Sequence, residues 1–301
     1  MTGAHRSGTT WVGRMLAADD GCAYISEPLN MLHRPGVFRA PVAYWYQYIC
    51  KENEDQFLPA FQETLKFQYH TWLEIKSLRS AKDVGRLMRD WRTFTRASAH
   101  VEHLLIKDPF AVFSAPWFAD RLNCQVVITV RHPAAFVSSL KRLDWPFEFD
   151  HLLSQPLLMR DWLEPFRKEM RELLTTKEDI FGSAALLWRM IYYVVDVYHE
   201  ENAAFQVVRH EDLSVDPVNG FRQLYKNLGL QFTPDIQQTI VQSSSSSNPQ
   251  ERSRRAVYET RLDSRANIEN WKRRLTTTEI ARIRTLTADI SSFYYEDKDW
   301  E

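Results

Sequence analysis

The chain has 301 residues, of which 44% are hydrophobic and 26% are charged, and its formal net charge is −1. This balance excludes a disordered chain, a fibre and a nucleic-acid-binding polycation. Its three cysteines are too widely spaced for a disulfide framework or a paired metal motif. The N-terminus lacks the apolar segment of a signal peptide, and the longest apolar stretch, Ala184 to Tyr198, is too short to span a bilayer. We therefore expect one cytoplasmic domain over residues 1–301, with no membrane span and no nucleic-acid partner.

The first segment with a specific pattern lies at the start of the chain. Three of the nine glycines fall within residues 3–13, and apolar residues then recur at helical spacing. Residues 3–18 are therefore predicted to form a tight loop that opens a helix. The backbone N–H groups of such a loop, the helix dipole and the hydroxyls of Ser7, Thr9 and Thr10 together favour a bound phosphate.

This loop differs from a Walker A loop, which requires lysine after its second glycine. Thr9 occupies that place, and the cation is Arg6, inside the loop. Two interpretations of such a phosphate-binding loop stay open at this point. They are a P-loop nucleotide or small-molecule kinase and a non-catalytic nucleotide-binding protein.

Three apolar runs are predicted to be strands, at residues 104–106, 125–130 and 205–209. The middle run, QVVITV, is unbroken and β-branched, which is typical of a central parallel strand. The segments predicted as helices are 54–73, 80–99, 157–175, 179–201, 218–228 and 276–290. This alternation predicts an α/β fold, a three-layer sandwich with a central parallel sheet and a P-loop-like loop.

A strand should precede the glycine loop, yet only Met1 and Thr2 do so. We expect either that the natural chain begins upstream of Met1 or that the first strand is missing or truncated. A shortened central strand would reduce stability.

A second anion site is predicted after the strand 125–130. Arg131 follows this strand, and Ser139 comes eight residues later in the next helix. Open α/β sheets bind ligands at the carboxyl ends of their strands, and arginine binds phosphate in a bidentate manner. The alternative is a structural arginine–carboxylate pair beside a surface serine.

In combination these motifs resemble the sulfotransferases that use 3′-phosphoadenosine 5′-phosphosulfate (PAPS), in particular bacterial members related to the tyrosylprotein branch. The resemblance includes RSGTTW at 6–11, KDPF at 107–110 and VRHEDL at 208–213. It implies PAPS as donor co-substrate, with the loop at its 5′ end and Arg131 and Ser139 at its 3′-phosphate. A basic tract, residues 252–284, would close over the nucleotide. The residues it implies for binding are Arg6, Ser7, Gly8, Thr9, Thr10, Trp11, Arg131, Ser139 and, within the basic tract, Arg265.

The resemblance also implies catalytic residues. Glu27, 21 residues after Arg6, stands where similar sulfotransferases have a catalytic glutamate, and we expect it to be the general base. The alternative is a structural ion pair. Arg6 and Lys107 are expected to stabilise the developing charge. His5 is predicted either to contact the sulfonate or to face solvent. The chemistry requires no metal, and the neighbouring pair His100 and His103 lacks further ligands.

The acceptor is expected to be a hydroxyl group. The helical segments 31–100 and 145–175 are assigned to the acceptor side. Aromatic residues concentrated in 31–72 and 145–166 either line a pocket there or pack in the core. By resemblance we rank a carbohydrate first, a lipid or polyketide second and a protein tyrosine third.

Overall fold

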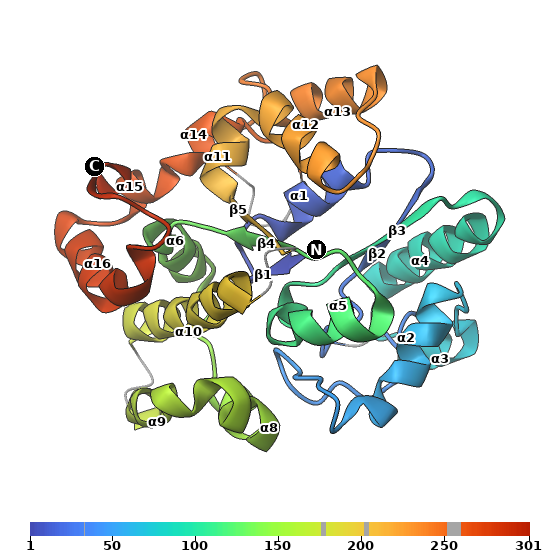
Figure 1. Cartoon of the computed structure of the whole chain (residues 1–301), viewed down its shortest axis with the longest axis horizontal. Coiled ribbons are helices and arrows are strands. Elements are labelled where there is room, and N and C mark those ends of the chain that lie inside the picture. The colour runs from blue at the N-terminus through green and yellow to red at the C-terminus, as the bar shows by residue number, and fades with distance from the viewer. Residues whose placement is uncertain (33, 176–178, 202–204, 252–259) are drawn as a thin grey trace.

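The computed structural model describes residues 1–32, 34–175, 179–201, 205–251 and 260–301 (Figure 1). Its strands are β1 (Thr2–Gly3), β2 (Cys22–Ser26), β3 (His103–Lys107), β4 (Val127–Val130) and β5 (Gln206–Arg209). Its α-helices are α1 (Thr9–Leu16), α2 (Leu58–Leu65), α3 (Thr71–Ser77), α4 (Ala81–His100), α5 (Ala115–Leu122), α6 (Pro133–Leu143), α7 (Asp150–Leu153), α8 (Pro156–Leu158), α9 (Arg167–Thr175), α10 (Ile180–Glu201), α11 (His210–Val215), α12 (Pro217–Asn227), α13 (Pro234–Ser244), α14 (Ser264–Ile268), α15 (Asn270–Arg274) and α16 (Thr277–Ser291).

All strand pairs are parallel, in one sheet of order β1-β4-β5 and one of order β2-β3. The two sheets are joined at the N-terminus. The Met1 ammonium group donates to the Ile106 carbonyl at 2.9 Å, and the Asp108 N–H donates to the Met1 carbonyl at 3.0 Å. The strands therefore follow one another as β2-β3-β1-β4-β5 (Figure 1). The first strand is present and central, but it is only two residues long.

Helices cover both faces of the sheet, which confirms the predicted α/β sandwich with a parallel sheet. Ile128 and Val130 of β4 pack in one core cluster with residues of α6, α10 and α16. Val127 of β4 and Val208 of β5 pack in a second cluster with residues of α1, α12 and α13. Successive side chains of a strand point to opposite faces, so β4 contributes to both cores and is buried along its whole length.

Two of the predicted helices are divided. The segment 54–73 breaks between α2 and α3, because Phe67 adopts a left-handed φ of 55°. The segment 157–175 becomes α8, a π-helical turn, a 3₁₀ turn and α9. Pro165 lies in the 3₁₀ turn and has no N–H to continue an α-helical ladder. Strand β2 was not predicted, since its alternation of buried and half-buried residues extends over only five positions.

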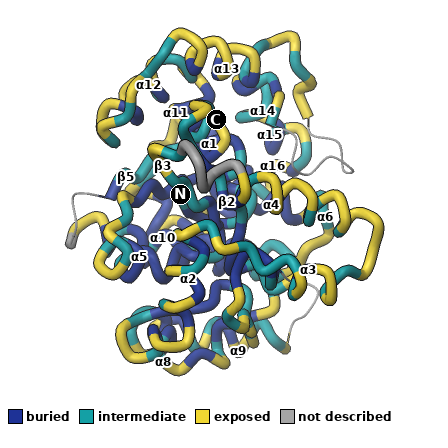
Figure 2. Tube along the Cα trace, turned by 90° about the vertical axis from the view of Figure 1, so that its right-hand side faces the viewer, coloured by how far each residue is buried: buried dark blue, intermediate teal, exposed yellow. Residues whose placement is uncertain are grey.

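Helix α10 is the central helix of the larger core. It is the one helix of the described residues that is long and apolar enough to cross a membrane, and 61% of its apolar stretch is buried inside the protein. The Trp188 indole donates to the Arg131 carbonyl at 2.8 Å, and the Tyr192 hydroxyl donates to the Thr129 carbonyl at 3.0 Å. Figure 2 shows the buried backbone gathered at the centre of the molecule around α10. We therefore interpret α10 as a core helix that supports the end of β4.

Candidate active site

The loop between β1 and α1 has a conformation that its sequence requires. Arg6 and Gly8 adopt positive φ values of 68° and 88°, and the Ser7 N–H donates to the Ala4 carbonyl at 3.1 Å. A Cβ atom at Gly8 would lie 2.1 Å from the His210 ring, so conformation and space both require glycine there. Gly8 is the N-cap of α1 and supplies no side-chain acceptor. The first N–H groups of α1 are therefore available to a ligand.

Strand β4 brings Arg131 to this loop. Nη1 of Arg131 donates to the Arg6 carbonyl at 2.7 Å, and Nε of Arg6 donates to Oγ of Ser139 at 3.1 Å. Ser139 lies on α6, the helix that follows β4. Three residues that are far apart in the sequence, and that were assigned to two separate phosphate sites, therefore line a single pocket.

The pocket is strongly cationic. Four guanidinium groups line it, those of Arg6, Arg131, Arg142 and Arg274. Burial lowers the pKa of Arg131; Glu211 opposes this shift, and Arg274 adds to it. Like charges that face one pocket destabilise each other until an anion enters between them. The pocket therefore favours a ligand with several negatively charged oxygens, and the guanidinium groups offer it bidentate hydrogen bonds.

The predicted binding residues do not all reach the pocket. Gly8, Thr9 and Thr10 line it together with the arginines. Ser7 and Trp11 are buried beneath the loop and in the core under α1. Arg265 is exposed, and its Nε donates to the Val215 carbonyl at 2.9 Å. The structure thus places Arg274, not Arg265, in the pocket.

Four polar residues that line the pocket were not predicted from the sequence, namely Arg142, His210, Asn267 and Arg274. Arg142 lies three residues after Ser139, on the same side of α6, and this spacing could have identified it. His210 follows the carboxyl end of β5, inside a motif that was quoted without a role for the histidine. Arg274 belongs to the predicted basic tract, of which residues 252–259 lie outside the described residues. No sequence signal distinguishes Arg274 from the other cations of that tract.

Two of the three predicted catalytic residues, Glu27 and Lys107, meet at the ends of β2 and β3, whereas Arg6 lines the pocket of guanidinium groups. Ser26 and Lys107 are partners in the parallel register, and Glu27 follows Ser26 with a left-handed φ of 54°. Nζ of Lys107 donates to Oε1 of Glu27, and the Asn30 amide donates to Oε2 at 2.8 Å. Lys107 is fully buried, and Glu27 is 9% exposed. The carboxylate therefore has a fixed orientation and a cation beside it.

The surroundings of Glu27 favour its ionised form. Burial alone would raise the pKa of Glu27, but Lys107, Asn30 and Arg34 outweigh burial, and the pKa lies below its usual value. Burial and the charge of Glu27 raise the pKa of Asp108, the next residue after Lys107, to about 7. Asp108 accepts hydrogen bonds from two backbone N–H groups, those of Leu29 and Phe110. The two carboxyl groups therefore differ in role. Asp108 fixes the backbone at Leu29 and Phe110, whereas Glu27 pairs with Lys107.

The structure pairs His5 with an aromatic residue, Tyr46. The His5 ring is half-buried, and Nδ1 lies 2.6 Å from the Tyr46 hydroxyl. Burial lowers the pKa of His5 to about 3, and Arg6 lowers it further while Glu27 opposes the shift. A neutral ring beside Arg6 supports the shape of the loop and adds no charge to it. Among the described residues no group of three or more His, Cys, Asp or Glu side chains could hold a metal ion.

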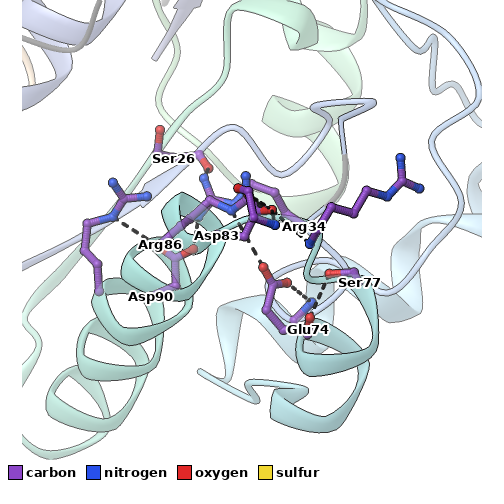
Figure 3. A network of polar contacts seen from close by, with 11 residues as sticks. Ser26, Arg34, Glu74, Ser77, Asp83, Arg86 and Asp90 are labelled. Atoms are coloured by element: carbon purple, nitrogen blue, oxygen red, sulfur yellow. Dashed lines mark hydrogen bonds and ion pairs between the residues drawn. The ribbon is translucent and has the colours of Figure 1, made fainter. Parts of the chain in front are cut away.

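A polar network fixes the chain that leaves β2 (Figure 3). Nη1 of Arg34 donates to the Ser26 carbonyl at 2.7 Å, and Nη2 pairs with Asp90 of α4. Glu74 of α3 accepts the Gly36 N–H at 2.9 Å. Both Arg34 and Asp90 are buried. The residue before Glu27 is therefore tied to α4, and the segment after Glu27 is tied to α3.

The residue after Arg131 is His132, and its ring lies among three aromatic side chains. The His132 ring stacks on Trp271 with 4.9 Å between ring centroids, and it meets the edges of Tyr295 and Trp300. Burial lowers the pKa of His132 to about 3. Between pH 6.5 and 3 the unfolded chain therefore binds a proton at this residue that the folded chain does not bind. Stability attributable to His132 is lost as the pH falls through this window.

We predict that His132→Phe reduces the pH dependence of unfolding. The change removes a difference of one proton between the two states, about 1.4 kcal/mol per pH unit within the window. Urea unfolding at a series of pH values measures the slope, and His103→Phe, at an exposed position of β3, is the control. An unchanged slope in His132→Phe would show that His132 is protonated inside the folded protein.

A parallel sheet, a glycine loop after its central strand and a cationic residue at the end of the neighbouring strand define an α/β protein whose pocket suits a polyanionic ligand. The sulfotransferase domain family matches residues 1–290, and the chain belongs to this family. The family resemblance drawn from the motifs is thereby confirmed. Its finer assignment to the tyrosylprotein branch stays a prediction.

Individual relatives are more distant. Mouse carbohydrate sulfotransferase 5 is 34% identical over 82 residues, which are 27% of this chain and 20% of that protein. Among solved structures, the sulfotransferase domain from the curacin biosynthetic pathway is 16% identical, with a TM-score of 0.49 over 98% of this chain and 96% of that chain. Mouse sulfotransferase SULT7A1 complexed with PAP is 12% identical, with a TM-score of 0.42 over 99% and 85% of the two chains.

Proposed function

We propose that this sulfotransferase takes its sulfuryl group from PAPS and transfers it to a hydroxyl acceptor. One observation carries the proposal: Arg131 bonds to the Arg6 carbonyl while Arg6 bonds to Ser139, so both predicted anion sites open into one pocket. PAPS has a phosphosulfate at its 5′ end and a separate phosphate at its 3′ position. A donor with two anionic ends needs several cations around one pocket, and the four guanidinium groups that line this pocket support the proposal.

The residues divide between the two ends of the donor. We assign the 5′-phosphosulfate to the loop from Arg6 to Thr10 and the start of α1, where Thr9 and Thr10 line the pocket and no side chain caps the helix. The 3′-phosphate is assigned to Arg131 and Ser139. Arg142 and Arg274 add positive charge to the same pocket. This assignment uses every guanidinium group that lines it.

In the proposed step, Glu27 accepts the proton of the acceptor hydroxyl as its oxygen attacks sulfur. The bond from sulfur to the acceptor oxygen forms, and the bond from sulfur to the 5′-phosphate oxygen breaks. Lys107 and Arg6 stabilise the charge that develops on the leaving and sulfuryl oxygens. A general base contributes about 10²–10⁴-fold, and each cation about 10²–10³-fold by analogy with oxyanion donors.

Lys107 has two partners in this scheme. In the structure its ammonium group is paired with Glu27, which favours the carboxylate but weakens it as a base. The proposal therefore requires Lys107 to turn from Glu27 towards the sulfuryl group when the donor is bound. Lys107 is the last residue of β3, and its four-carbon side chain is flexible enough for such a turn.

We predict that Lys107→Met shifts the acidic limb of the pH profile of kcat/KM to higher pH. Without the ammonium group the effect of burial on Glu27 is less opposed, so its pKa rises and the base is lost at higher pH. We also expect kcat to fall about 10²–10³-fold. The matched control is Lys141→Met, because Lys141 is exposed and pairs with Glu279 on the surface. An acidic limb that does not move would show that Lys107 does not lower the pKa of Glu27.

A carbohydrate hydroxyl is the proposed acceptor, and the 82-residue similarity to a carbohydrate sulfotransferase supports this ranking. Lipid or polyketide hydroxyls come second and tyrosine third. The aromatic segments favour none of them, because many of their rings pack in the core. Examples are Tyr46, Phe61 and Phe149, each at most 1% exposed.

Sulfate transfer is tested by incubating the chain with sulfur-labelled PAPS and a panel of carbohydrate, lipid and phenolic acceptors, with a native extract as the last member. The proposal expects label in a hydroxyl-bearing product and release of PAP. Transfer of phosphate from ATP to the same panel, with no transfer from PAPS, would assign the site to a kinase. Tight PAP binding without transfer to any acceptor would favour a non-catalytic nucleotide-binding protein.

A further inference from the structure

A band of exposed apolar side chains runs along α3 and α4. On α4, Val84, Met88 and Trp91 are each between 45% and 48% exposed, and their spacing of four and three places them on one side of the helix. On α3, which packs against α4, Trp72 and Ile75 are exposed at a spacing of three. We call these five residues the α3–α4 band. Ten large hydrophobic side chains are exposed in the described part of the chain, and half of them belong to this band. Such clustering indicates an interaction surface.

The same two helices and the turn between them expose a set of cations. Five of the six lysines and arginines between residues 71 and 95 are exposed, namely Lys76, Arg79, Lys82, Arg89 and Arg92. On α4, Arg92 lies next to the apolar stripe, and Arg89 and Lys82 lie further round the helix on the same side of the stripe. α3 and α4 lie on the right-hand side of Figure 1, which faces the viewer in Figure 2.

The acidic residues of this segment are turned inward. Between residues 71 and 95 there are only Glu74, Asp83 and Asp90. Glu74 is fully buried and Asp90 is buried against Arg34, while the half-buried Asp83 accepts the Ser80 N–H at the start of α4. Figure 3 shows all three acidic residues within the network that leads to Ser26. The outward surface is therefore cationic as well as apolar.

We propose that the α3–α4 band docks on the surface of an anionic lipid bilayer. Tryptophan, aliphatic side chains and cations on one helical surface are the composition of interfacial membrane-binding helices. Each cation near an anionic bilayer adds to the affinity, and the aliphatic side chains enter the acyl boundary.

The composition of this surface disfavours two other binding partners, a second copy of the chain and a soluble anionic polymer. A two-fold contact between two copies of the band would place the five cations of one copy against the five of the other. A soluble anionic polymer would neutralise the cations but leave Val84 and Met88 in water. An anionic bilayer satisfies both parts of the surface.

The network of Figure 3 connects this surface to the candidate active site. Arg34 joins Asp90 of α4 to the Ser26 carbonyl, and Glu27 is the next residue. Docking through α4 therefore sets the position of Glu27 relative to the lipid surface. The docking proposal does not rest on sulfuryl transfer, because its test measures binding alone.

Cosedimentation of the full chain with lipid vesicles tests the proposal. Vesicles of phosphatidylcholine with phosphatidylglycerol are expected to bind the chain, and vesicles of phosphatidylcholine alone to bind it much less. Added salt should weaken the binding. Lys82→Glu combined with Arg92→Glu should lower the partition coefficient about thirtyfold or more, because each lost cation costs about fivefold and each added carboxylate repels the anionic lipid. Trp91→Ser should lower it about tenfold.

Two control variants lie elsewhere on the surface. Lys168→Glu changes an exposed cation of α9, and Phe293→Ser changes a side chain that is 62% exposed near the C-terminus. Neither should alter the partition coefficient, and all variants should keep the unfolding midpoint of the parent chain. Equal binding to both vesicles, or no binding to either, would overturn the proposal. So would a dimer in light scattering that Trp91→Ser dissociates, or binding to dextran sulfate that matches binding to vesicles and is insensitive to Trp91→Ser.

Discussion

Glu27→Gln is expected to lower kcat about 10²–10⁴-fold and to leave the affinity for PAP close to that of the parent chain. Glutamine has the shape of glutamate and keeps an oxygen for the Asn30 amide, but it cannot accept the proton of the acceptor hydroxyl. The side chain lies at the end of β2, beside Lys107 and outside the ring of guanidinium groups that lines the pocket. Single-turnover transfer from labelled PAPS measures the first quantity, and calorimetric titration with PAP measures the second.

The matched control is Glu148→Gln, at an exposed position before α7. It should change neither turnover nor PAP affinity. Near-normal turnover in Glu27→Gln would mean that another group takes the proton. A parallel loss of turnover and PAP affinity would instead assign Glu27 to the shape of the site, since its left-handed backbone and its pair with Lys107 also order the end of β2.

Arg131→Ala is expected to weaken PAP binding by about 10–10²-fold, the range of a lost hydrogen bond to a charged group. Binding of AMP, which lacks the 3′-phosphate, should fall far less. The reason is position: Arg131 follows β4 and faces the same pocket as Ser139 and the loop. Calorimetric titration with PAP and with AMP gives, for each nucleotide, the ratio of the variant's dissociation constant to that of the parent chain.

Two further variants separate the explanations. Arg131→Lys keeps the charge but loses the planar fork, so it should recover only part of the PAP affinity. Arg265→Ala should have no effect, because the structure places Arg265 against the Val215 carbonyl and not in the pocket. Equal losses of PAP and AMP in Arg131→Ala would assign the residue to support of the loop through the Arg6 carbonyl.

Much of the fold could be predicted from the sequence, because its central strands carry strong patterns. The run from 125 to 130 is apolar and β-branched without interruption, and β4 lies within it. β2 escaped notice because an edge strand of five residues alternates weakly. The break of the segment 54–73 depends on the left-handed conformation of Phe67, which no helical pattern shows.

Some residues of the candidate site could also be predicted from the sequence, and others could not. Arg6, Arg131 and Ser139 could be predicted as anion-binding residues, in two separate sites, because each belongs to a recognisable strand or loop motif. Trp11 could not be placed correctly, because the motif does not say which face of α1 enters the core. The choice between Arg265 and Arg274 depends on the short helices α14 and α15, whose relative direction is set by tertiary packing.

The assignment to PAPS depends most on one property of the pocket. The pocket must bind a nucleotide with phosphates at two positions, and it must do so without magnesium. The direct measurement is the unfolding temperature of the unaltered chain with PAP, with AMP and with ATP plus Mg²⁺. We expect PAP to raise it most, AMP to raise it less and ATP plus Mg²⁺ to add nothing beyond AMP. Stabilisation by ATP plus Mg²⁺ without stabilisation by PAP would contradict the account.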